Sequence, residues 1–137
     1  MAKAQAGVSR TSSRPRPLSP HLSIYRWPVT MLTSILHRAT GVALYSGSAF
    51  LLIWLVAAAS GPEAYFRIME IYGSPIGIAV MAAYSWALAY HLLNGVRHLF
   101  WDAGAGFEKS QANASSYLVL LGSLALAAGV WALTLTV

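Results

Sequence analysis

The sequence predicts an all-α integral membrane protein in which three transmembrane helices form an antiparallel bundle. Of its 137 residues, 57% are hydrophobic and only 9% are charged, a balance outside that of soluble domains. Three windows lack Asp, Glu, Lys and Arg: Gly41–Ser60, Ser74–Val96 and Ser115–Val137. Each reaches the roughly 20 residues that cross a bilayer, where the backbone has no water to bond. We therefore expect helices over about residues 31–60, 74–98 and 115–137.

The basic residues are distributed unevenly around these spans. Of nine Lys and Arg residues, six precede the first span, Arg67 alone lies in the connection Gly61–Gly73, and Arg97 and Lys109 follow the second span. Because Lys and Arg favour the cytoplasmic side, we expect the N-terminus and the second connection to face the cytoplasm. This asymmetry accounts for the net charge of +5, so membrane lipid, and no nucleic acid, is the expected partner of the basic residues.

The chain divides into a basic arm and a membrane anchor. Residues 1–15 are small, polar and basic without apolar periodicity, so we expect a disordered cytoplasmic arm ahead of an anchor over residues 16–137. The arm lacks the apolar core of a signal peptide and the amphipathic face of a mitochondrial presequence. This start favours the bacterial inner membrane over the mitochondrial one. The absence of cysteine excludes disulfides and iron–sulfur ligation by this chain.

The second span contains an ionisable residue, His91. At about 1.5 Å of rise per residue it lies roughly 9 Å below the boundary charge of Arg97. Ala87 and Gly95 stand one turn to either side and leave room for a flat group or a closely packed helix. His91 therefore either bonds across helices or serves as a metal ligand, for haem in particular. At the boundary itself, we expect Arg97 and His98 at the membrane interface, where one of them could meet a haem propionate.

A second group of polar residues lies just before the first apolar window. Ser34, His37 and Arg38 share one face of a helix, and they present a hydroxyl, an imidazole and a guanidinium in the same leaflet as His91. Arg38 alone is typical of a helix end that reaches toward lipid headgroups. The three together suit a ligand with carbonyl oxygens and an apolar tail, such as a quinone.

Three ordered segments carry a resemblance to a known family: Arg16–Tyr25 (RPLSPHLSIY), Ser34–Gly41 (SILHRATG) and His91–Asp102 (HLLNGVRHLFWD). With their spacing they resemble the cytochrome b556-type large membrane-anchor subunits of succinate dehydrogenase, the succinate:quinone oxidoreductase of respiratory complex II. The version resembled is that of mitochondria and their alphaproteobacterial relatives. The resemblance implies a subunit of an enzyme of the tricarboxylic acid cycle and aerobic electron transport, whose succinate-oxidising site lies on another chain.

The resemblance also implies roles for single residues. His91 corresponds to an axial ligand of the haem b iron, with the opposite ligand supplied by a smaller hydrophobic anchor subunit. Ser34 and Arg38 correspond to residues that line the ubiquinone pocket, and Trp27 corresponds to an aromatic residue at its mouth. His37, like Arg38, corresponds to a position near the haem propionates.

Other positions are implied to face the membrane surface or partner subunits. His98 and Asp102 correspond to recurrent positions, to which we assign interfacial support near the haem. His21 is expected to lie against the iron–sulfur subunit. That subunit would deliver electrons from succinate, oxidised in a flavoprotein subunit, to ubiquinone. No residue of this chain is expected to be catalytic.

Two other functions fit the same composition and spacing. The first is a membrane scaffold without a redox role, in which the histidines only hold helices together. The second is a stand-alone b-type cytochrome, or a fumarate-reducing relative that takes electrons from quinol. Haem content distinguishes the scaffold from the two cytochrome functions. The direction of turnover distinguishes the stand-alone or fumarate-reducing cytochrome from the succinate:quinone oxidoreductase subunit.

Overall fold

The computed structural model describes residues 24–134 and 136, and this part of the chain contains helices and no strand. The helices are α1 (Val29–Ser60), α2 (Pro62–Tyr72), α3 (Pro75–Asp102) and α4 (Lys109–Thr134). The three long helices are apolar enough to cross a membrane, which confirms the predicted all-α membrane fold. The expected arm at residues 1–15 and the expected contact of His21 lie outside the described residues.

The long helices extend further into polar sequence than the apolar windows indicated. Helix α3 continues to Asp102 and α4 begins at Lys109, whereas the sequence predicted boundaries near residues 98 and 115. Hydropathy detects only the part of a helix that suits lipid, but backbone hydrogen bonds continue through polar residues at the surface. Helix α1 has 32 residues and is roughly 48 Å long, against roughly 30 Å for the hydrocarbon core of a bilayer.

The connection between the first two spans is itself helical, which the apolar windows did not predict. Gly61 separates α1 from α2 with a φ of 113°, in the region that favours glycine. Pro62 at the first helical position and Glu63 in the first turn then favour a helix start. Beyond α2, Ser74 caps α3, because its hydroxyl accepts a hydrogen bond from the Gly77 amide at 3.1 Å. The chain thus reverses through a short helix.

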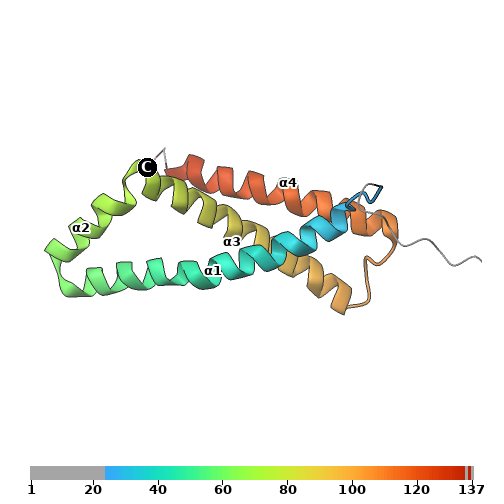
Figure 1. Cartoon of the computed structure of the whole chain (residues 1–137), viewed down its shortest axis with the longest axis horizontal. Coiled ribbons are helices and arrows are strands. Elements are labelled where there is room, and N and C mark those ends of the chain that lie inside the picture. The colour runs from blue at the N-terminus through green and yellow to red at the C-terminus, as the bar shows by residue number, and fades with distance from the viewer. Residues whose placement is uncertain (1–23, 135, 137) are drawn as a thin grey trace, which may run out of the picture.

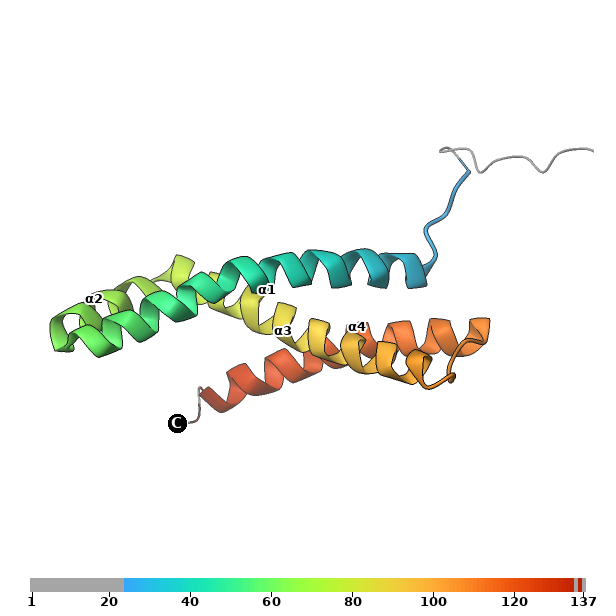
Figure 2. The same cartoon turned by 90° about the horizontal axis from the view of Figure 1, so that it is seen from below.

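Helix α3 lies between α1 and α4 and packs against both (Figure 1). The start of α1, the end of α3 and the start of α4 lie at one end of the bundle, and α2 lies at the other end (Figure 1 and Figure 2). The segments that the sequence singled out, at the start of α1 and in the second half of α3, are therefore neighbours in space.

The surface of α1 that faces α3 carries small buried residues at a spacing of seven. These are Thr33, Thr40 and Gly47, which we call the α1 seam. A seven-residue spacing keeps one face of a helix against its neighbour. From α3, Arg97 contacts Thr33, His91 contacts Thr40, and Tyr84 lies against Gly47.

Small residues make up most of the remaining interior. In the described part of the chain, the buried apolar residues are alanines apart from Tyr90 and Val119. The large apolar side chains point outward instead, as shown by Leu118, which is 68% exposed. Lipid is as apolar as leucine, so helices in a membrane gain most from close packing of small residues. The exposed apolar surface is accordingly suited to lipid or to a membrane partner.

One cation, Arg97, lies inside the bundle and is only 6% exposed. Its three guanidinium nitrogens donate hydrogen bonds to oxygen atoms of α1, α3 and α4 at 2.9–3.3 Å. The sequence predicts Arg97 and His98 at the membrane interface, where one of them could meet a haem propionate; the structure turns the Arg97 side chain into the bundle, so that of the two His98 is the one left for that role. A buried cation needs acceptors, and the oxygens of Thr33, Asn94 and Ser115 and the Ala112 carbonyl supply them inside the chain.

Gly47 provides a test of the packing between α1 and α3. A Cβ at this position would overlap the ring of Tyr84. We expect Gly47→Ala to force the two helices apart and to destabilise the bundle by about 1–3 kcal/mol, the usual cost of overpacking. The measurement is thermal unfolding of the purified protein in detergent, together with any subunits that co-purify.

The matched control is Gly129→Ala, because a Cβ at Gly129 on α4 meets nothing within 4 Å. We expect Gly129→Ala to unfold near the wild-type temperature. Equal effects of the two substitutions would contradict the close approach of α1 and α3 at Gly47.

Candidate functional site

Three histidines meet where α1 crosses α3. The ring of His37 on α1 stacks on the ring of His91 on α3, with centroids 4.0 Å apart and planes inclined by 18°. The ring of His98 lies 5.2 Å from that of His37, tilted by 32°. The crossing thus brings together three predicted site residues from two different spans, and we call them the histidine cluster.

His91 is oriented by a hydroxyl of the facing helix. Its Nδ1 lies 3.2 Å from Oγ1 of Thr40. That hydroxyl has one hydrogen, which it donates to the backbone carbonyls of Leu36 and His37 at 2.8 and 3.0 Å. In the tautomer that carries its hydrogen on Nδ1, the Thr40 oxygen accepts from His91 and the neutral imidazole keeps a free lone pair on Nε2. Metal-binding histidines are commonly oriented through their other ring nitrogen in this way.

The surroundings of His91 are compatible with a single nitrogen ligand to a metal, as in haem. The ring is half-buried and lies beside the backbone of Gly41, where a Cβ would stand 3.2 Å from Cε1. Among residues 24–134 and 136, no group of three or more His, Cys, Asp or Glu could hold a metal ion. The site therefore offers one well-oriented nitrogen and no closed metal cage. Nε2 of His37, beside it, is buried without a hydrogen-bond partner.

The residues predicted to line a quinone pocket lie on the outer side of the first turns of α1. Ser34 and Arg38 are exposed, one turn apart on the same face. In the part of the chain that the structure describes, neither side chain forms a hydrogen bond or an ion pair. Trp27 lies two residues before α1 and is 62% exposed. His37, which the sequence assigned to the same face, turns toward α3.

The two residues assigned interfacial support occupy different environments. His98 lies edge-on to Trp101, with ring centroids 5.0 Å apart, and belongs to the histidine cluster. The indole of Trp101 donates a hydrogen bond to the Gly106 carbonyl at 3.2 Å, which ties the end of α3 to the following loop. Asp102, the last residue of α3, is exposed. The structure therefore places His98 beside His37 and leaves Asp102 exposed one turn further along α3.

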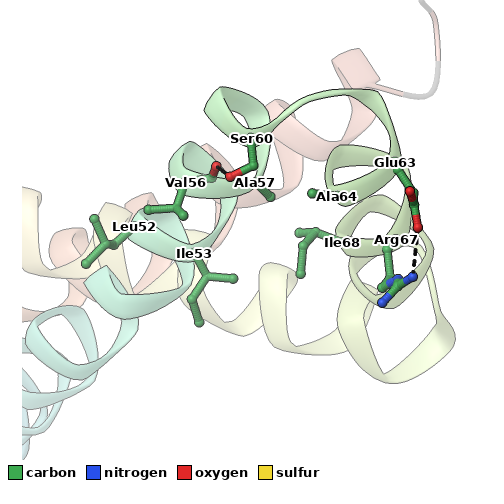
Figure 3. A pocket seen from close by; sticks show the side chains of 9 residues that line it. All are labelled: Leu52, Ile53, Val56, Ala57, Ser60, Glu63, Ala64, Arg67 and Ile68. Atoms are coloured by element: carbon green, nitrogen blue, oxygen red, sulfur yellow. Dashed lines mark hydrogen bonds and ion pairs between the residues drawn. The ribbon is translucent and has the colours of Figure 1, made fainter.

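An open groove of about 620 Å³ lies between α1 and α2 (Figure 3). Helix α2 lies at the end of the bundle away from the start of α1 and the end of α3 (Figure 1). None of the predicted site residues lines the groove. Glu63 and Arg67 at its edge form an exposed pair at 3.2 Å, and such pairs contribute little to stability. We therefore place the candidate site at the histidine cluster and the adjoining face of α1.

Sequence reasoning missed the two threonines that bond α3 from the α1 seam. Thr40 lies inside the quoted segment Ser34–Gly41, but a single threonine in an apolar helix does not indicate a partner. The signal that could have found both threonines is the spacing of Thr33, Thr40 and Gly47, which marks one face of α1 as small and closely packed.

Comparison with known proteins gives the family. The family model of the succinate dehydrogenase/fumarate reductase transmembrane subunit matches residues 12–130. The chain is 47% identical over 112 residues to the succinate dehydrogenase cytochrome b556 subunit of Paracoccus denitrificans, covering 82% of this chain and 86% of the relative. It is 40% identical over 116 residues to the subunit of the same name from Rickettsia conorii, with coverage of 85% and 90%. It is 36% identical over 126 residues to the mitochondrial succinate dehydrogenase cytochrome b560 subunit of Bos taurus, with coverage of 88% and 75%.

These similarities confirm the resemblance that three short segments indicated. The bacterial relatives and the three apolar helices identify a multi-pass protein of the inner membrane, and mitochondrial relatives exist as well. The histidine cluster and the face of α1 that carries Ser34 and Arg38 lie within the matched residues. The chain belongs to the succinate dehydrogenase/fumarate reductase transmembrane subunit family, as a membrane-anchor cytochrome b subunit of the succinate dehydrogenase complex.

Proposed function

We propose that this subunit binds haem b through Nε2 of His91, with the opposite ligand supplied by a smaller hydrophobic anchor subunit. The observation that carries the proposal is the Thr40 hydroxyl, which is 3.2 Å from Nδ1 of His91 and can hold the tautomer whose Nε2 lone pair would bind the iron. The word cytochrome in the names of the relatives supports haem as the bound cofactor. When bound, haem supplies a one-electron carrier whose potential is tuned by its axial ligands and its burial. His37, which stacks on His91, and Arg38 are proposed to lie near the propionates, and His98, beside His37, to support them.

We further propose that Ser34 and Arg38 form part of a ubiquinone site, with Trp27 at its mouth. Both side chains are exposed on one face of α1, and neither is engaged within the described part of the chain. A hydroxyl donor and a fixed cation can bond the quinone oxygens and stabilise the negative charge that develops during reduction. The apolar tail would lie in lipid or against the exposed apolar surface of the bundle.

In this proposal the end of the bundle that carries the histidine cluster faces the cytoplasm, as the distribution of basic residues predicts. An iron–sulfur subunit would dock there and pass electrons from a flavoprotein subunit to ubiquinone. The role of this chain is to bind and orient ubiquinone and haem. The chemistry of succinate oxidation takes place elsewhere in the complex.

His91→Ala tests the haem ligand. We expect the reduced-minus-oxidised visible spectrum of the purified complex to show a low-spin b-type haem in the wild type, and to lose or change it in the variant. The matched control is Leu92→Ala, because Leu92 is adjacent and 57% exposed, and we expect it to keep the wild-type spectrum. A wild-type complex that assembles without haem would instead support a scaffold in which His91 only bonds across helices.

Thr40 gives a second test that leaves the ligand itself in place. Thr40→Val removes the acceptor for Nδ1–H at nearly constant volume, and loss of such an outer partner typically weakens metal binding by about tenfold to a hundredfold. We expect the variant complex to lose haem on dilution or mild heating, followed by absorbance. Thr40→Ser retains the hydroxyl and should retain haem like the wild type. Equal haem retention in Thr40→Val and Thr40→Ser would contradict the orienting role.

Ser34→Ala tests the quinone site. We expect reduction of ubiquinone by succinate to fall, because one donor to the quinone oxygens is lost, while succinate oxidation by a soluble artificial acceptor is unchanged. Ser46→Ala is the matched control, since Ser46 is an exposed serine of α1 that bonds only carbonyls of its own helix, at 2.9 and 3.2 Å. If Ser34→Ala lowers both activities together, the residue serves assembly and the quinone assignment is wrong.

A further inference from the structure

We propose that Arg97 and Tyr90 are positioning residues for the quinone site, acting through Thr33 on α1. This inference rests on the proposed function, because it concerns how Ser34 and Arg38 are held in place. The buried polar group around Arg97, at the end of the bundle that carries the histidine cluster, would thereby orient the ligand-facing turns of α1.

Arg97 connects the three long helices at one point. Its Nε donates to Ser115 Oγ at 2.9 Å and its Nη2 to the Ala112 carbonyl at 3.1 Å, both on α4. Its Nη1 donates to Thr33 Oγ1 of α1 at 3.1 Å and to Asn94 Oδ1 at 3.3 Å. The guanidinium also lies 4.1 Å from the centre of the Trp101 ring. These bonds fix the guanidinium in direction as well as in depth.

On α1, two side chains of α3 bond the same residue, Thr33. Thr33 is fully buried, and while its hydroxyl accepts from Arg97, its backbone carbonyl accepts from the Tyr90 hydroxyl at 2.7 Å. The Thr33 hydroxyl donates its own hydrogen to the Thr30 carbonyl at 2.9 Å. Two side chains of α3 therefore fix both the rotation and the axial position of α1 at Thr33.

Ser34 is the next residue along the chain, and Arg38 follows one turn later. The preceding segment gives little support, because Pro28 provides no side-chain cap and Trp27 is exposed. The bonds at Thr33 are thus the hydrogen bonds nearest to Ser34 that tie α1 to another helix. A change at Thr33 would shift the hydroxyl and the guanidinium that face the quinone, without removing either of them.

The bonding groups around Arg97 are all neutral oxygens, so the buried charge is balanced by several directed hydrogen bonds and not by one carboxylate. Loss of a single acceptor therefore weakens the whole arrangement and frees the start of α1 to move. Because Thr33 takes part in no expected ligand contact, its substitution separates positioning from direct binding.

The test uses Thr33→Val and Thr33→Ser in the complete complex. Valine keeps the shape of threonine and removes the acceptor for Arg97, whereas serine keeps the acceptor. Displaced bonding groups bind the quinone head group less well, so we expect Thr33→Val to raise the KM for a short-tailed ubiquinone by roughly tenfold, with kcat less affected. We expect Thr33→Ser to restore wild-type behaviour, and oxidation of succinate by a soluble acceptor to stay unchanged in both variants.

The matched control is Ser123→Ala, because Ser123 is another fully buried hydroxyl that bonds only its own helix, at 2.9 Å. A wild-type KM in an assembled Thr33→Val complex would overturn the positioning role. Failure of Thr33→Val to assemble, with Ser123→Ala intact, would also overturn it and assign the network to assembly alone. Ser34→Ala is measured in parallel. If Ser34→Ala leaves quinone reduction unchanged, the proposed quinone site is wrong. If Ser34→Ala lowers quinone reduction but Thr33→Val does not, only the positioning role is refuted.

Discussion

The guanidinium of Arg97 must find oxygen acceptors inside a bundle that lipid surrounds, and the three long helices are arranged to supply them. A charge of this kind is tolerated in an apolar interior only when its donors are bonded. Thr33, Asn94, Ser115 and the Ala112 carbonyl meet that requirement from three helices. Through Thr33, these bonds tie the first turns of α1 to α3, while the small residues of the seam allow the two helices to approach.

Two threonines use the same chemistry at different levels of the bundle. Thr33 and Thr40 each donate a hydrogen to a carbonyl of their own helix and also bond a side chain of α3: Arg97 donates to Thr33, and Nδ1 of His91 pairs with Thr40. The first hydroxyl meets a guanidinium and fixes a helix, while the second meets an imidazole and can hold the hydrogen on Nδ1. Because both belong to the α1 seam, the geometry proposed for quinone and the geometry proposed for haem depend on the same helix crossing.

The sequence predicted the parts of the structure that depend on composition and on short segments. Apolar windows located the three spans, and the quoted segments around His37 and His91 indicated residues that α1 and α3 bring within 4.0 Å. It did not predict the inward direction of Arg97, because a basic residue just after an apolar window also suits the membrane surface. It did not predict α2 either, since helicity there arises from Gly61, Pro62 and Glu63 and not from an apolar run.

The placement of Ser34 and Arg38 on one outer face could be expected from helical spacing, but the turn of His37 toward α3 could not. Helical spacing predicts which residues share a face of one helix, whereas the angle at which two helices cross decides which residues face the other helix. That angle is set by the small residues of the seam and by side chains far away in the sequence, such as Tyr84 beside Gly47.

The small-residue interior has a consequence for how this subunit tolerates sequence drift. In a soluble domain, the largest buried side chains restrict evolution most, because trimming them leaves cavities. Here the buried faces consist mainly of Gly, Ala, Ser and Thr, while the bulky side chains lie outside, where one apolar residue can replace another against fluid lipid. The positions with least freedom to vary are therefore those with the least volume, and growth by a single methyl group is a greater hazard to the subunit than the loss of one.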